Sequence, residues 1–260
     1  MHAVTCNWIG THAHVTHHRV RRTMSVQKNT VEKSDRRKTA EKLLSPVEDV
    51  VTAIAAGRMV VLVDDEDREN EGDLVIAAEK ITPEAVNFMI TQGRGLLCMP
   101  MSAERAEQLE LPPMVERNED DFGTAFTLSC DATAEHGVTT GISAFDRATT
   151  IKLAAGEGDP GDLHRPGHVF PLIAKDEGTL ARIGHTEAAV DLAKMAGLSP
   201  VAAIVEIVGE SGHMLRLPEL MPWCAEHGIA ISTIERLREY RQAQVDAGVP
   251  VDRRLDGERF

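Results

Sequence analysis

Residues 59–79 read "MVVLVDDEDRENEGDLVIAAE" and predict two buried strands joined by an acidic loop. The apolar runs at 59–63 and 73–79 are short and rich in Val and Ile, which is typical of strands that are covered on both faces. Between them, residues 64–74 hold seven acidic side chains and a single basic one, Arg68. So much like charge at the end of a buried strand needs a structural or functional explanation.

Strands and helices are predicted to alternate on both sides of this stretch. Helices are predicted at 45–57, 82–93, 102–111, 146–156, 186–197, 218–228 and 235–244, and further strands at 95–100, 125–132, 201–209 and 229–234. Residues 157–168 are rich in Gly and Pro and are predicted to form a loop. No linker is expected to exceed about a dozen residues, a length above which loops are uncommon in compact domains. The pattern favours a single α/β domain at 45–242, with a mixed β-sheet between helices.

The charge of the chain is divided unevenly. Its formal net charge is −13, whereas residues 1–42 hold nine Lys or Arg and three acids, a net of +6, so the remainder carries −19. Five of the eleven histidines also lie in this N-terminal part. We predict a flexible, basic, His-rich extension at 1–44 and a polar tail at 243–260. A transit peptide, an RNA-binding arm, a misassigned start with Met24 available, and a dispensable tail are all open readings of the extension.

Composition excludes several classes of function. An acidic body argues against nucleic acid as the main partner, because neutralising phosphates needs basic residues. No run approaches the ~18 apolar residues of a membrane span, and the start lacks the apolar block of a secretory signal. The four cysteines, at 6, 98, 130 and 224, are scattered without a CxxC pair. They predict reduced thiols in a cytoplasmic protein, with organelle targeting by the extension left open.

The acidic loop is predicted either to bind cations or to form a solvated face. A helix is unfavourable because it would set Asp65 beside Glu69 and Asp67 beside Glu71, both like-charged pairs. In an extended loop, the acids at alternate positions would share one face: 65, 67, 69, 71 and 73. Carboxylate oxygens suit a hard divalent ion such as Mg²⁺ or Mn²⁺. Loops that follow buried strands are also where open α/β sheets commonly bind ligands.

The segment "RIGHTE" (182–187) directly precedes a predicted helix. Arg182 and the N–H groups at the helix N-terminus could bind a phosphate. A plain capping turn at Thr186 is the alternative.

Three single residues are further candidates. His168, in "HRPGHVFPL" (164–172), lies in a segment that we interpret as a tight turn, and it is a general base, a ligand or a structural histidine. Glu206 lies inside an apolar strand, where a carboxylate is costly unless it is paired, protonated or turned toward a site. Cys98 is expected to be a small core residue rather than a nucleophile.

Four segments, in this order and spacing, closely resemble the 3,4-dihydroxy-2-butanone 4-phosphate synthases of riboflavin biosynthesis. They are "DDEDRENEGDL" (64–74), "GVTTGISAFDRATTI" (137–151), "RPGHVFPL" (165–172) and "RIGHTEAAVDL" (182–192). The resemblance implies a three-layer fold and a homodimer with active sites near the subunit interface. It also implies two Mg²⁺ (or Mn²⁺) ions per site and conversion of D-ribulose 5-phosphate to L-3,4-dihydroxy-2-butanone 4-phosphate and formate.

The resemblance also implies roles for individual residues. Glu69 and His185 match the metal ligands, His168 and Glu206 match the positions essential for catalysis, and Asp64 is our first choice for a loop carboxylate that moves a proton. The implied substrate contacts are Arg68, Glu69, Glu71, Asp73, Cys98, Arg182, Ile183, Gly184, His185, Thr186 and Glu206. Because Mg²⁺ prefers oxygen ligands, a Glu–His pair should bind it weakly until substrate hydroxyls complete the site.

Other functions fit the sequence less well. A fusion with GTP cyclohydrolase II would need a zinc-binding cysteine cluster, which this sequence lacks, so a bifunctional enzyme is not expected. A sugar-phosphate isomerase or aldolase would use similar enediolate chemistry without releasing formate. A non-catalytic scaffold should have lost at least one of four residues, all of which are present: Glu69, His168, His185 and Glu206.

Overall fold

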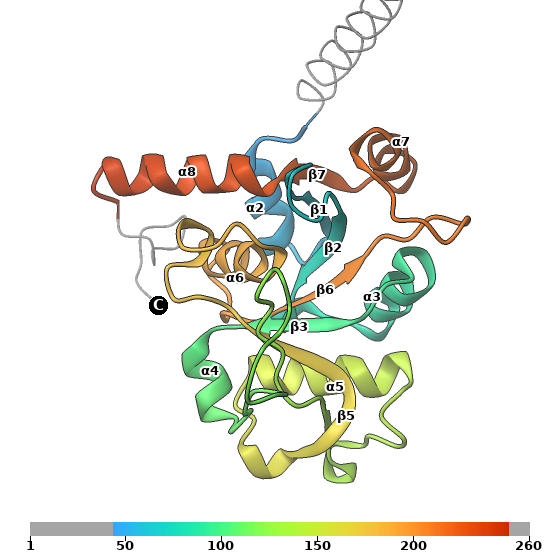
Figure 1. The fold of residues 1–260 in the computed structure, drawn as a ribbon. Helices are drawn as coiled ribbons and strands as arrows, with labels where there is room; N and C mark the ends of the chain where they lie inside the picture. Colours follow the sequence, from blue (N-terminus) through green and yellow to red (C-terminus); the bar gives the residue numbers. More distant parts are fainter. Residues whose placement is uncertain (1–43, 250–260) are drawn as a thin grey trace, which may run out of the picture. The chain divides into compact units, whose positions relative to one another are not determined.

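The computed structural model describes residues 44–249, so the predictions for residues 1–43 and 250–260 lie outside the described residues. A seven-stranded sheet in the order β4-β5-β3-β6-β2-β1-β7 forms its centre (Figure 1). The strands are β1 (Val60–Val63), β2 (Gly72–Ala77), β3 (Cys98–Met101), β4 (Cys130–Ala132), β5 (Leu163–Ile173), β6 (Ala202–Glu206) and β7 (Ala230–Thr233). The β1–β7 and β3–β5 pairs are parallel and the others are antiparallel, which confirms the predicted mixed sheet.

Helices cover both faces of the sheet, as the α/β prediction requires. They are α2 (Val47–Ala55), α3 (Pro83–Phe88), α4 (Ala103–Gln108), α5 (Ala144–Ala155), α6 (His185–Met195), α7 (Leu217–His227) and α8 (Ile234–Asp246). The shorter helical turns are η1 (Ala78–Lys80), η2 (Met89–Gly93), η3 (Ala134–His136), η4 (Pro160–Asp162) and η5 (Gly178–Leu180). Buried side chains of α2, α6 and α8 pack on one face, and those of α5 and α7 pack on the other.

The sheet has an apolar core on each face, because successive side chains of its strands point alternately to the two faces. On β1, Val60 and Leu62 join the core beneath α2 and α6, whereas Val61 and Val63 join the core beneath α5 and α7. Successive side chains of a strand point to opposite faces, so a strand that is apolar at every position must be covered on both. The short apolar runs seen in the sequence are therefore the central strands of a three-layer domain.

Two predicted segments differ from the structure. Residues 163–168, predicted as a loop and a tight turn, belong to the eleven-residue strand β5. The pairing partner β4 imposes this extended conformation, with Ala132 opposite Leu163 and Asp131 opposite His164. Gly167 allows the close approach, because a Cβ there would lie 2.1 Å from the backbone of Cys130. Tertiary pairing thus overrides the local preference of Gly and Pro for turns.

The predicted strand at 125–132 is shorter than expected. Only Cys130–Ala132 forms β4, and residues 109–129 contain no helix or strand apart from isolated bridges such as Phe126 to Leu172. This segment exceeds the dozen residues expected of any linker. At the other end of the chain, α8 continues to Asp246, four residues into the predicted polar tail.

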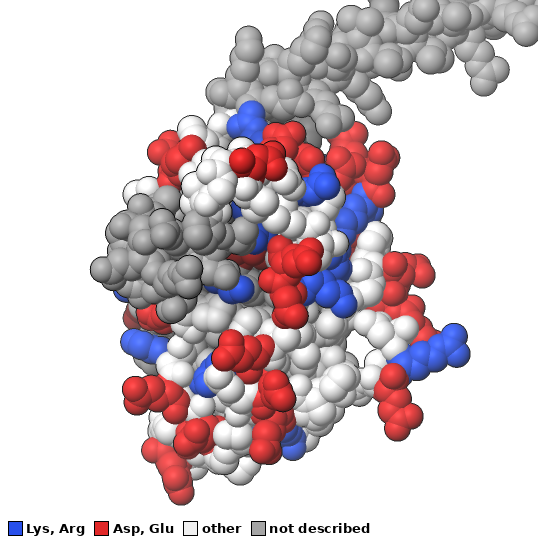
Figure 2. All heavy atoms as spheres, turned by 90° about the vertical axis from the view of Figure 1, so that its left-hand side faces the viewer, with Lys and Arg blue, Asp and Glu red and all other residues white. Residues whose placement is uncertain are grey.

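The surface in Figure 2 carries acidic side chains spread widely, with basic ones interspersed rather than gathered into a patch. This distribution agrees with the negative charge of the sequence after residue 42. Within residues 44–249, no helix has both the length and the apolar character that crossing a membrane requires.

Candidate active site

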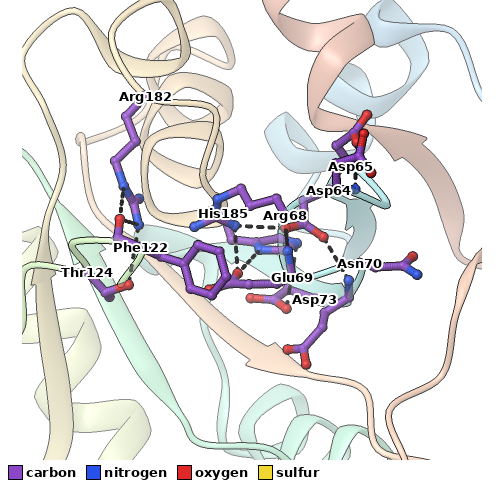
Figure 3. A network of polar contacts seen from close by, with 12 residues as sticks. Asp64, Asp65, Arg68, Glu69, Asn70, Asp73, Phe122, Thr124, Arg182 and His185 are labelled. Carbon is purple, nitrogen blue, oxygen red and sulfur yellow. Dashed lines mark hydrogen bonds and ion pairs between the residues drawn. The ribbon is translucent and has the colours of Figure 1, made fainter. Parts of the chain in front are cut away.

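The acidic loop between β1 and β2 folds around the carboxylate of Asp64. This side chain is 0% exposed. Its Oδ1 accepts the Glu71 N–H at 2.7 Å, and its Oδ2 accepts the Glu69 N–H at 3.1 Å and Nη1 of Arg68 at 2.8 Å (Figure 3). The extended loop with all its acids on one face is therefore wrong. Hydrogen bonds from N–H groups to a charged carboxylate are strong enough to organise a compact turn instead.

The turn divides the acids into two groups. Asp65, Glu66 and Asp67 are exposed, whereas Asp73 is buried and Glu69 and Glu71 are half-buried. Three acids therefore form the solvated face that was one of the two alternatives for the loop, and the others turn inward. The inward part is held by Arg216, the N-cap of α7, whose Nη1 donates to the Glu69 carbonyl at 2.8 Å.

His185, the first residue of α6, lies among the inward carboxylates. Its Nδ1 is 3.7 Å from Oε2 of Glu69, and its Nε2 is 3.8 Å from Oδ1 of Asp73 (Figure 3). Nε2 of His185 and Oδ1 of Asp73 are both buried and have no hydrogen-bond partner. Buried polar atoms are rarely left unpaired, so the pair marks a place built for another group.

The electrostatics of this cluster favour a cation. Burial raises the pKa of Asp73 to about 7, with Glu206, Glu69 and Glu71 adding to the rise while His185 opposes it. Burial by itself lowers the pKa of His185, but Asp73, Glu69 and Asp64 outweigh it and raise that pKa to about 9. The His185 contact lowers the pKa of Glu69. The carboxylates therefore crowd together at a cost that positive charge relieves.

A divalent ion fits this arrangement. One ligand atom each of Asp64, Glu69 and His185 lie within 4.8 Å of one another. Two of these residues, Glu69 and His185, are the metal ligands that the motif resemblance implied. The carboxylate oxygens suit Mg²⁺ and the imidazole widens the choice to Mn²⁺. Both oxygens of Asp64 already accept hydrogen bonds from the loop, so it is the least free of the three.

A cavity of about 200 Å³ opens beside the cluster. Nine predicted substrate contacts line it: Arg68, Glu69, Glu71, Asp73, Cys98, Arg182, His185, Thr186 and Glu206. Of the other two, Ile183 packs against the core and Gly184 is the N-cap of α6. Asp73 and Glu206 are opposite each other on β2 and β6, so their side chains share one face of the sheet. Burial raises the pKa of the Cys98 thiol, in keeping with an unreactive core cysteine.

Arg182 lies at the N-terminal end of α6, held in a fixed direction. Its Nη1 donates to Oε2 of Glu187 at 2.6 Å, and Glu187 is only 1% exposed. Helix α6 begins at His185 with Gly184 as N-cap and no capping side chain, so Thr186 is the second helical residue rather than the cap. The first N–H groups of a helix lack partners within it and favour anions. An arginine beside an uncapped helix end is an anion-binding arrangement.

The segment 109–129 supplies cavity residues that sequence reasoning missed. Asp120, Thr124 and Phe126 line the cavity together with Leu172 and Ile204. The neighbouring Phe122 is tied to the site twice: the Arg68 guanidinium lies 5.1 Å from its ring centre, and Nη2 of Arg182 donates to its carbonyl at 3.1 Å (Figure 3). The signal in the sequence that could have found them is the polar run "NEDDFGT" at 118–124.

His168 is the predicted site residue that lies apart from the others. It is on β5, four residues from the cavity-lining Leu172, which places it roughly 13 Å farther along the strand. Its side chain is 42% exposed and pairs with Asp131 of β4, Nδ1 to Oδ2, at 2.6 Å. Within one described chain, His168 does not line the cavity formed by the other candidates.

Over most of its length the chain is similar to known proteins. Residues 48–240 match the family model described as 3,4-dihydroxy-2-butanone 4-phosphate synthase. The riboflavin biosynthesis protein RibBA of Aquifex aeolicus is 56% identical over 196 residues, which are 75% of this chain and 48% of that protein. The 3,4-dihydroxy-2-butanone 4-phosphate synthase of Cronobacter sakazakii is 49% identical over 199 residues, 76% of this chain and 91% of that protein.

A solved structure is similar as well. A 3,4-dihydroxy-2-butanone 4-phosphate synthase in complex with two magnesium ions is 42% identical, with a TM-score of 0.74 over 80% of this chain and 100% of that chain. The chain spans about half the length of several relatives that it matches, such as the synthase of Photobacterium phosphoreum, of which 54% is covered. The matched region contains the whole sheet and every candidate site residue, and the chain belongs to the 3,4-dihydroxy-2-butanone 4-phosphate synthase family.

Proposed function

We propose that this chain converts D-ribulose 5-phosphate to L-3,4-dihydroxy-2-butanone 4-phosphate and formate. One observation carries the proposal: a single cavity joins a buried carboxylate–histidine cluster that favours a cation to an arginine at an uncapped helix N-terminus. A sugar phosphate offers hydroxyls to the first and a phosphate to the second. The cavity volume of about 200 Å³ is below the roughly 300–1,000 Å³ of pockets for larger ligands, which suits such a small substrate.

The reaction needs no external oxidant or reductant. The atoms of the five-carbon substrate divide completely between the four-carbon ketone phosphate and formate. What the site must do is move protons at carbon and oxygen and stabilise enediolate or alkoxide charge. One water leaves the sugar, the carbon skeleton rearranges, and one water is added back as formate is released, so the atoms balance. Titratable groups close to both ends of the substrate are therefore required.

We assign Glu69 and His185 as the protein ligands of two Mg²⁺ or Mn²⁺ ions. When bound, such ions would stabilise negative charge on the substrate oxygens. Support comes from the unpaired atoms Nε2 of His185 and Oδ1 of Asp73, and from the two magnesium ions in the related structure. Asp64, with both oxygens accepting hydrogen bonds from the loop, is assigned to shaping the turn rather than to proton transfer.

Glu206 is assigned to proton transfer at carbon. It lies at the end of β6 beside the Asp73 carboxylate, and its Oε2 accepts the Leu96 N–H at 2.8 Å, which fixes the carboxylate at the cavity wall. Arg68 and Arg182 both line the cavity and contribute positive charge there, and they bind and orient the substrate.

His168 is assigned to the same reaction from a second copy of the chain. A base that lies outside its own cavity reaches the substrate if a second subunit brings it there. Gly141 lies against His168, and in the same 137–151 segment Ile142 and Phe145 are 53% and 67% exposed. Large exposed apolar side chains of this kind favour a protein partner. A homodimer with the cavities near the subunit interface accounts for both features.

The proposal is tested by incubating the purified full chain with D-ribulose 5-phosphate and Mg²⁺. We expect stoichiometric formate and ketone phosphate, with no turnover in EDTA and recovery when Mn²⁺ is added. Consumption of the pentulose without formate would favour the isomerase or aldolase reading, and no consumption at all would favour a non-catalytic homologue.

Metal binding is expected to depend on the substrate. The protein supplies few ligands, and one of them is an imidazole, so Mg²⁺ should bind weakly until substrate hydroxyls complete its coordination. Mn²⁺ titrations followed by electron paramagnetic resonance, with and without ribulose 5-phosphate in the Glu206→Gln variant to prevent turnover, should show at least about a tenfold gain in affinity, which corresponds to 1.4 kcal/mol. Tight binding of the metal to the free protein would contradict this expectation.

A further inference from the structure

We propose that Asp131 is a positioning residue for His168, which it holds in the one tautomer that leaves Nε2 free to accept a proton. The inference rests on the proposed function, which assigns His168 to proton transfer. It adds Asp131 of β4, which the motif resemblance did not single out.

The geometry commits Asp131 to His168. Oδ1 of Asp131 accepts the backbone N–H of His168 at 2.8 Å, and Oδ2 lies 2.6 Å from Nδ1 of the ring. An ionised carboxylate can only accept, so Nδ1 carries the ring proton and Nε2 keeps its lone pair. The Asp131 side chain is 11% exposed, whereas the His168 side chain is 42% exposed. Among residues 44–249, the hydrogen bonds of His168 with Asp131 use the backbone N–H and Nδ1, and nothing donates to Nε2.

A second element holds the pair in place. Gly141 has φ +91°, and a Cβ there would lie 1.9 Å from Oδ2 of Asp131 and 2.7 Å from Nδ1 of His168. The backbone of this glycine therefore covers the hydrogen bond. Asp146 fixes that backbone from α5, because its Oδ2 accepts the Gly141 N–H at 3.1 Å and the Thr139 hydroxyl at 2.9 Å. The motif "GVTTGISAFD" (137–146) thus builds a wall against the Asp131–His168 pair.

A purely structural pair would look different. The same chain contains His136 and Asp162, with Nε2 and Oδ1 2.9 Å apart and the two side chains 31% and 30% exposed. There the carboxylate is shared with the backbone of Asp159, as a turn requires. In the Asp131–His168 pair, both carboxylate oxygens accept from one histidine, whose side chain is 42% exposed against 11% for Asp131. The two hydrogen bonds fix the orientation of the ring, and much of its surface stays exposed.

The orientation has a direct consequence for the reaction. As a base, His168 would take the proton of a substrate hydroxyl on Nε2, so that the O–H bond breaks, an N–H bond forms and the ring becomes an imidazolium. Asp131 would then face the imidazolium through Nδ1–H and stabilise its charge without itself gaining the proton. Return of the proton from Nε2 to the product restores the starting tautomer.

Asp131→Asn tests the proposal, because its amide can donate to Nδ1 and favour the opposite tautomer. We expect kcat to fall by about 10²–10⁴-fold with KM changed by less than about threefold, as for a wrong tautomer in a well-characterised His–Asp pair. Asp162→Asn makes the same change in the other pair and should leave both constants unchanged. The double variant Asp131→Asn/His168→Gln should be no slower than His168→Gln alone.

Nitrogen-15 NMR of the ring supplies a readout that needs no variant. The wild-type protein should show His168 protonated at Nδ1, and Asp131→Asn should shift the proton to Nε2. A wild-type ring protonated at Nε2 would overturn the inference even if the variant failed to fold. Full activity of Asp131→Asn beside an inactive His168→Gln would also overturn it and leave the proposed function standing. Full activity of His168→Gln would instead remove His168 from the proposed function, and the role of Asp131 with it.

Discussion

Glu69→Gln is expected to lower the rate of formate release by about a thousandfold while leaving the fold intact. The substitution keeps the size of the side chain and removes its charge. In the structure this carboxylate contacts Nη1 of Arg68 at 2.6 Å and lies 3.7 Å from Nδ1 of His185. Loss of a metal ligand should forfeit several kcal/mol of charge stabilisation in the transition state, and about 4 kcal/mol corresponds to a thousandfold.

Glu66→Gln is the matched control for this prediction. It removes the same charge from the same loop, but Glu66 is exposed and does not line the cavity. The control should retain nearly all of the formate release and bind Mn²⁺ in the presence of substrate as the wild type does. If Glu69→Gln kept more than about a tenth of the activity, the loss of transition-state stabilisation would be less than about 1.4 kcal/mol. The assignment of Glu69 as a metal ligand would then fail.

Asp191→Ala is expected to lower the free energy of unfolding by about 3–5 kcal/mol, the usual cost of stranding one member of a buried ion pair. Asp191 of α6 and Arg241 of α8 are each 3% exposed and form a short ion pair. The same carboxylate oxygen accepts the N–H and hydroxyl of Thr179 at 2.8 and 2.7 Å. Removing the Asp191 carboxylate leaves the Arg241 guanidinium buried without this ion pair. It also removes the hydrogen bonds to Thr179 that hold the turn η5, which leads to Arg182.

Urea denaturation of Asp191→Ala and Glu235→Ala compares this pair with an exposed one. Glu235 and Arg238 on α8 are 3.4 Å apart, with side chains 49% and 43% exposed. Exposed pairs contribute about 0–1 kcal/mol, so Glu235→Ala should change stability by no more than that. Equal urea midpoints for the two variants would contradict the claim that the buried Asp191–Arg241 pair between α6 and α8 is needed for stability.

Most of the fold was predictable because it depends on local patterns. Apolar runs such as 60–63 predict central strands, since a strand without polar alternation must be covered on both faces. Capping residues such as Thr82 and Ser102 mark helix starts, and both side chains accept the expected backbone N–H. The failures occurred where distant segments decide the conformation, as in residues 163–168, whose extended form is imposed by pairing with β4.

The candidate site was predictable in its members but not in its shape. Motif resemblance implied most residues that line the cavity, yet the loop carboxylates do not lie on one extended face, because Asp64 gathers the backbone into a turn. Nothing local indicated that Phe122 would lie against Arg68, or that Asp120 would line the cavity. These contacts come from residues 109–129, which form no helix or strand. The conformation of such a segment depends on the parts of the protein against which it packs.

The sequence alone determined the fold class, most of the strands and helices, and the kinds of side chain available for chemistry, because these follow from periodicity, capping and residue type. Only the tertiary structure decided which acids turn inward, which buried atoms lack partners, and that His168 is committed to Asp131 away from its own cavity. The reason is physical: burial and hydrogen bonding depend on segments distant in the chain, and they set the charge and direction of each group far more than its neighbours in sequence do.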